Sequence, residues 1–173
     1  MNRFVEVAQE YARRVLSGER PACKWERLAV VRQLEDLQRE ASDDWPWIFK
    51  PELASRPCDF IELLPHIKGK WARERLLITL DGWQCFVLTT VFGWVHRTTG
   101  LRRFREAYIE VPRKNAKSTL SSGVALFMLS ADGEHGAEVY SAATTRDQAR
   151  IVFDDAKAMA EIGRASCRER VWR

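Results

Sequence analysis

Residues 108–120, with the sequence YIEVPRKNAKSTL, decide the fold predicted for this chain. An apolar strand is predicted at 107–111, a basic loop follows at 112–116, and an apolar helix is predicted over 117–131. The order of strand, loop, Lys-Ser/Thr and helix is the layout of a nucleotide-phosphate loop. The N-terminus of such a helix offers an anion free backbone N–H groups and the positive end of a dipole.

The loop departs from the Walker A pattern at both glycine positions. That pattern places glycine six residues and one residue before the lysine, and these positions are Val111 and Ala116 here. In a phosphate loop, Lys117 would reach the β- and γ-phosphates, and the Ser118 hydroxyl would hold Mg²⁺. The alternative is an ordinary helix N-terminus with a solvated lysine, which the missing glycines favour when the loop is taken alone.

Sequence on both sides of the loop resembles the large terminase subunits of tailed phages, the ATPases that drive viral DNA into procapsids. The loop of that family often opens with an arginine and is written much like residues 112–118, PRKNAKS. The resemblance extends over residues 10–162. Its further segments are 18–19, 22–29, 60–63, 68–69, 83–84, 92–94, 100–104, 139–145 and 147–149.

The resemblance implies an α/β fold that contains part of the parallel sheet of an ASCE-type phosphate-loop NTPase. An N-terminal helical segment is expected at 1–70 and the opening half of the ATPase core at 71–163. In this family the acidic strand that binds Mg²⁺, the catalytic glutamate and the nuclease domain follow later, so we expect them beyond residue 163. A basic tail at 164–173 breaks the preceding periodicity; it is either foreign to the protein or a frayed helix turn.

Periodicity and turn residues predict the other elements. Strand–helix–strand order predicts parallel pairing with right-handed connections. The predicted helices are 3–16, 24–40, 83–96, 117–131 and 145–161; the predicted strands are 107–111 and 137–142; residues 42–59, with three prolines, are predicted to be mainly loop. In the second helix the apolar residues near one face are Trp25, Leu28, Val31, Leu34 and Leu37.

The resemblance also implies roles for individual side chains with ATP and Mg²⁺ as cofactors. Arg113 would act beside Lys117 on the γ-phosphate, since a guanidinium can clamp a phosphate in a bidentate manner; Lys114 is as well explained as a solvated loop residue. Gln84 would read the adenine edge, because its amide has one donor and one acceptor side; the alternative is a polar residue at a helix N-terminus. The remaining nucleotide-binding residues would be Asn115, Ala116, Ser118 and Thr119.

Two later segments carry polar residues that could be mistaken for parts of the site. Thr144, Thr145 and Gln148 follow the second predicted strand, and a helix N-cap is their favoured interpretation over coupling of ATP state to DNA. The pair Asp154-Asp155 resembles a magnesium-binding strand end. We assign it instead to a helix that packs through Val152 and Phe153.

Composition bounds the function only loosely. The chain has 173 residues and a net charge of +4, of which residues 164–173 contribute +3, so bulk charge says little about DNA binding. Four scattered cysteines and three scattered histidines predict neither a disulfide framework nor a protein-bound metal. No apolar run is long enough for a transmembrane helix, and no signal peptide is recognised.

The function implied by the resemblance is that of the N-terminal part of a terminase large subunit. The whole protein would be a DNA-packaging ATP hydrolase with endonuclease activity, in the cytoplasm of the infected bacterium. Its partners would be double-stranded DNA, the portal protein, the small terminase subunit and other copies of itself on the portal. The alternatives are a non-enzymatic interaction module with a vestigial loop and a helicase-like ATPase.

Overall fold

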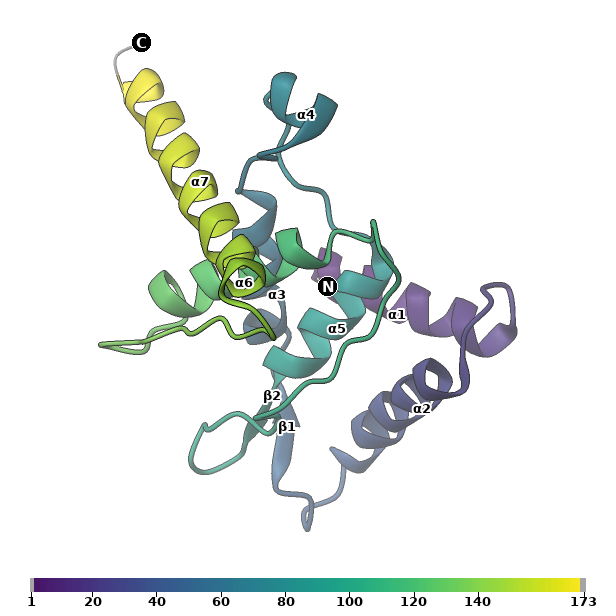
Figure 1. The fold of residues 1–173 in the computed structure, drawn as a ribbon. Helices are drawn as coiled ribbons and strands as arrows, with labels where there is room; N and C mark the ends of the chain where they lie inside the picture. Colours follow the sequence, from purple (N-terminus) through teal and green to yellow (C-terminus); the bar gives the residue numbers. More distant parts are fainter. Residues whose placement is uncertain (1, 172–173) are drawn as a thin grey trace. The chain divides into compact units, whose positions relative to one another are not determined.

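The computed structural model describes the backbone of residues 2–171 and the side chains of residues 2–163. Its helices and strands are labelled in Figure 1. The chain divides into two compact units, and the sequence of each is interrupted. The first unit comprises Met1–Cys58 and Leu80–Tyr108, and the second comprises Asp59–Thr79 and Ile109–Arg173.

The first unit is built on the packing of α1 (Arg3–Ser17) against α5 (Gly82–Gly93). The N–H of Phe4 donates to the Asn2 side chain at the start of α1, which closes the helix end with a side-chain cap. Gly82 allows the close approach of α5, because a Cβ there would lie 3.3 Å from the Tyr11 Cβ. The buried face of α1 consists of Phe4, Val5, Ala8, Tyr11, Ala12 and Val15.

Helix α2 (Lys24–Arg39) forms where it was predicted, but it buries a different face. Three members of the predicted apolar face are exposed: Trp25, Leu28 and Val31. The buried side chains are instead Val30, Gln33 and Asp36. Gln33 accepts a hydrogen bond from the indole N–H of Trp94 at 2.8 Å, and Asp36 accepts one from Arg103 at 2.6 Å. These polar contacts satisfy the groups that the inward face buries.

The prediction of a mainly irregular segment over 42–59 is wrong. This stretch contains strand β1 (Trp47–Phe49) and most of helix α3 (Pro51–Glu62). Pro51 lies in the first turn of α3, where a missing N–H has no cost. Pro57 lies inside the helix and is fully buried, so its packing compensates for the lost backbone hydrogen bond.

Helix α5 ends at Gly93, earlier than the prediction of 83–96. The next three residues form β2 (Trp94–His96), which pairs antiparallel with β1 in a register that sets Trp94 opposite Phe49. A Cβ on Gly93 would collide with the Phe49 ring, so the helix end and the strand pair both depend on this glycine.

The second unit contains the end of α3 and three further helices: α4 (Gly69–Arg73), α6 (Lys117–Ser130) and α7 (Arg146–Val171). Helix α6 agrees with the prediction and packs against α7, as Figure 1 shows. Gly123 of α6 lets Ile61 of α3 approach, because a Cβ there would lie 2.9 Å from the Ile61 side chain. Helix α7 starts as predicted and runs beyond 161, but the side chains of the basic tail lie outside the described residues.

The predicted strands at 107–111 and 137–142 are not strands in this structure. Both segments lack assigned secondary structure, and within the described part of the chain the named strands form only the antiparallel pair of β1 and β2. Tyr108 and Tyr140 are more than four-fifths exposed. A strand requires a neighbour that accepts and donates ladder hydrogen bonds, and neither segment belongs to a named strand in the described residues. The described residues therefore form a mixed helix and strand structure whose one named sheet is antiparallel.

In the described residues, no helix combines the length and apolar character that a bilayer span requires.

Candidate functional site

The loop before α6 has an unusual backbone. Lys114 and Ala116 both have positive φ, 68° and 53°, although neither is glycine. Backbone that alternates between left-handed and right-handed residues turns successive N–H groups to one side and forms an anion-binding nest. Such conformations carry strain in residues with a Cβ, and they concentrate at functional sites. The conformation at Ala116 is the one that glycine adopts easily, at one of the two positions where Walker A loops have glycine.

The Lys117 side chain reaches back across the loop. Its ammonium donates a hydrogen bond to the carbonyl of Val111 at 2.8 Å. This contact joins the first residue of α6 to the residue that precedes the loop, and it keeps the charge of an exposed lysine beside the loop backbone. The ammonium would have to exchange this carbonyl for phosphate oxygens in order to act on a nucleotide.

The Asn115 side chain forms hydrogen bonds with the backbone of its own loop. Its amide nitrogen donates to the carbonyls of Pro112 and Arg113 at 3.2 and 3.3 Å. Arg113 and Lys114 are both exposed. The sequence suggested a nucleotide contact for Asn115, and the structure gives it a role in the loop's own conformation.

Ser118 and Thr119 lie half-buried in the first turn of α6. No side chain caps this helix at Ala116. The uncapped N–H groups and the helix dipole therefore meet at the loop, where they favour an anion. The Ser118 hydroxyl is a hard oxygen donor of the kind that Mg²⁺ takes when phosphate and water complete its shell. One such donor fits a magnesium ion that is held mainly by a nucleotide.

Ser122 was not singled out by the sequence. Its side chain is fully buried, and its hydroxyl lies 2.8 Å from the carbonyl of Ser118 and 2.9 Å from that of Val152. It therefore joins the first turn of α6 to α7. The run of small residues that contains Ser122 and Gly123 was the available signal, since small residues mark close helix packing.

Gln84 belongs to the first unit, whereas the loop belongs to the second. The Gln84 side chain is buried, and its carbonyl oxygen accepts a hydrogen bond from the backbone N–H of Asp81 at 2.8 Å. This bond is one of the two reciprocal hydrogen bonds of a capping box at the start of α5. The structure thus gives Gln84 the helix N-terminal role that was the alternative to adenine recognition.

Helix α7 begins with the predicted cap. The hydroxyl of Thr145 accepts a hydrogen bond from the backbone N–H of Gln148 at 3.3 Å, and the hydroxyl of Thr144 donates to the Gln148 side chain at 2.8 Å. These three residues are exposed, and Thr144 and Thr145 both hydrogen-bond with Gln148. The favoured interpretation as a helix N-terminus is confirmed.

Asp154 and Asp155 lie in a helix, as predicted. Asp154 pairs with Arg150 on the surface at 3.5 Å. Asp155 is buried and lies 2.5 Å from the ammonium of Lys68. The expectation that α7 packs through Phe153 is wrong, because this ring is 62% exposed while Val152 is half-buried. Within the described residues, no group of three or more His, Cys, Asp or Glu side chains could hold a metal.

A strained loop that leads through a lysine into an uncapped helix defines a candidate phosphate site. Residues 82–172, just over half of the chain, match the family model for the ATPase domain of the terminase large subunit. This chain belongs to that family. The family implies nucleotide use and a part in phage DNA packaging. No curated protein and no solved structure matches the chain.

Proposed function

We propose that this chain is the N-terminal part of a terminase large subunit and binds Mg-ATP at residues 111–119. The observation that carries the proposal is the loop conformation: left-handed Lys114 and Ala116 precede an uncapped helix that begins with Lys117. Its position inside the family match supports the proposal, because the match covers the loop and both flanking helices.

Each loop residue has a proposed task that its chemistry supports. Lys117 neutralises the β- and γ-phosphates, Arg113 clamps the γ-phosphate and Ser118 holds Mg²⁺. Asn115 stabilises the loop by its two backbone contacts. The first-turn N–H groups, with Ala116 and Thr119, line the phosphate side. Catalysis in this chemistry is mainly positioning and electrostatic stabilisation.

Adenine recognition by Gln84 is a separate part of the proposal. The carbonyl side of its amide is engaged by Asp81, and the nitrogen side carries two N–H donors. The amide oxygen has a second lone pair, so it can accept from adenine N6 while the nitrogen donates to N7, and guanine lacks that N6 donor.

We also propose that the segments 107–111 and 137–142 pair as parallel strands in the complete ATPase core. Helix α6 lies between them in sequence, which is the arrangement of a right-handed crossover unit. Two of their apolar side chains, Ile109 and Val139, are more than two-fifths exposed. A sheet formed with further strands would bury them.

The proposed whole protein hydrolyses ATP to move double-stranded DNA and cuts it with a separate nuclease domain. Its proposed partners are the portal protein, the small subunit and other copies of the large subunit, in the cytoplasm of an infected bacterium. Asp154 and Asp155 are engaged by Arg150 and Lys68. We therefore propose that they are not the carboxylates of hydrolysis, and that this chain alone binds ATP without turning it over.

Calorimetric titration of the purified chain with Mg-ATP tests the proposal. We expect Lys117→Ala to weaken binding about 10- to 100-fold, which corresponds to the loss of one charged hydrogen bond of about 1.5–3 kcal/mol. Lys157→Ala is the matched control, because Lys157 is an exposed lysine of α7 with only a 3.9 Å contact to Glu161. Equal affinity of both variants would favour the interaction module with a vestigial loop.

A further inference from the structure

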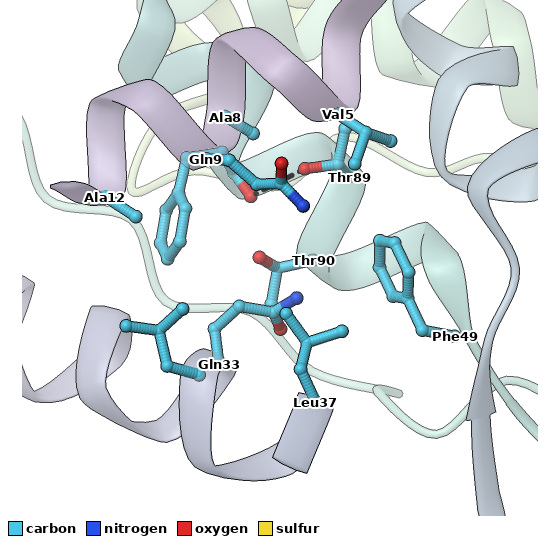
Figure 2. Close-up of a pocket in the computed structure, with 11 residues that line it drawn as sticks. Val5, Ala8, Gln9, Ala12, Gln33, Leu37, Phe49, Thr89 and Thr90 are labelled. Atoms are coloured by element: carbon cyan, nitrogen blue, oxygen red, sulfur yellow. Dashed lines mark hydrogen bonds between the residues drawn. The ribbon is translucent and has the colours of Figure 1, made fainter. Parts of the chain in front are cut away.

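The first unit contains a cavity of about 30 Å³ among α1, α2, α5 and β1, shown in Figure 2. Most of its wall is apolar, with Val5 and Phe86 among the lining residues. Four polar side chains also line it: Gln9, Gln33, Thr89 and Thr90. Gln9 is the one exposed member of the lining, so the cavity has a route to solvent on the α1 side.

Thr90 is the unusual residue of this cavity. Its side chain is 5% exposed, and its buried hydroxyl has no hydrogen-bonding partner in the described part of the chain. The neighbouring Thr89 behaves differently, because its hydroxyl donates to the Cys85 carbonyl at 2.7 Å within α5. Figure 2 shows the Thr90 oxygen directed into the cavity, between Gln9 and Gln33. Buried hydroxyls without a partner are rare in folded proteins, and each one calls for an explanation.

We propose that this cavity is a specific water-binding site, in which one or two waters join the Thr90 hydroxyl to the amide of Gln33. A water needs about 10–15 Å³ of such space and two to four polar partners, and the cavity meets both requirements. The Gln33 oxygen is taken by the Trp94 indole N–H, so its amide nitrogen is the group that donates to water. Gln9 supplies a further amide at the open side. The bound water thereby links α1, α2 and α5.

A cavity that holds water and a dry cavity predict opposite changes in the thermal midpoint of Thr90→Val. Thr90→Val keeps the shape of the side chain and removes the hydroxyl. If water bridges this hydroxyl, the variant loses the bridge, and we expect its thermal midpoint to fall by about 2–4 °C. If the cavity is dry, the variant removes an unsatisfied buried group, and the midpoint rises. Thr90→Ser keeps the hydroxyl, so it should retain the water. Thr89→Val is the comparison for a threonine of the same lining whose hydroxyl already donates to the Cys85 carbonyl.

Nuclear Overhauser contacts between water and the protein test the site directly in the full chain. We expect contacts from long-lived water to the Thr90 methyl and the Gln33 amide protons in the wild type, Thr90→Ser and Thr89→Val, and their loss in Thr90→Val. Absence of these contacts in the wild type would overturn the proposal. So would xenon-induced shifts at Val5 and Phe86, because xenon enters apolar cavities that are dry. The wild-type spectrum decides the question even if Thr90→Val does not fold.

Discussion

The carboxylate of Asp155 on α7 lies 2.5 Å from the ammonium of Lys68, although 87 residues separate them in sequence. The two sides of this pair are unequal, because the Asp155 side chain is 7% exposed and that of Lys68 is 69% exposed. Lys68 thus extends from the surface to a carboxylate that is largely shielded from water. The contact joins α7 to the segment before α4 within the second unit.

Lys68→Ala should destabilise the chain by about 1–3 kcal/mol, because it leaves a buried carboxylate without its cation. Urea unfolding followed by circular dichroism measures this change. Lys70→Ala is the matched control: its ion pair with Glu74 is exposed and 3.6 Å long, and such pairs contribute about 0–1 kcal/mol. Equal losses in the two variants would show that Asp155 does not depend on Lys68.

Ser122→Ala should cost about 1 kcal/mol, since it removes the hydroxyl that reaches the carbonyls of Ser118 and Val152. The preceding residue offers a control of the same chemistry, because Ser121 is exposed on α6. Its replacement by alanine should stay within about 0.5 kcal/mol. Hydrogen exchange of α7 amides adds a local measurement, and we expect faster exchange in Ser122→Ala alone. Unchanged exchange would contradict the link between α6 and α7.

Ala116→Gly should stabilise the chain by up to about 1 kcal/mol, because glycine adopts a φ of 53° without steric strain. The gain is limited by the greater freedom of glycine in the unfolded state. Ala125→Gly, in the interior of α6, the helix that follows Ala116, should instead cost about 1 kcal/mol. We expect thermal unfolding to show opposite shifts for the two variants; shifts of the same sign would contradict strain at Ala116.

Gln84→Ala should remove the preference for ATP over GTP if Gln84 reads the adenine edge, and should also cost about 0.5–2 kcal/mol through the lost helix cap. Asp81→Ala separates the two effects, because it perturbs the same helix start and leaves the Gln84 amide in place. Competition titrations with both nucleotides measure the preference. An unchanged ratio in Gln84→Ala would leave this residue with a capping role alone.

The sequence by itself was sufficient for the elements that depend on neighbouring residues. Helix α6 follows the loop where the apolar pattern predicted it, and the Thr145 cap was predicted from its residue type and place. The same is true of α1 and α7, whose periodicity is local. The loop at Lys117 together with the segments on both sides of it was also enough to identify the family, which the match over 82–172 then supported.

The tertiary structure decided which surfaces are buried and which partners meet. A local pattern placed Trp25 inside, but the pairing of Asp36 with Arg103, 67 residues away, turns another face of α2 inward. Proline in the sequence argued for a loop at 42–59, but burial of Pro57 outweighs its poor helix propensity. The segment 107–111 has the composition of a strand but is not part of the sheet that β1 and β2 form. For α2 the deciding contact comes from a residue far along the chain, where hydrophobic periodicity carries no information.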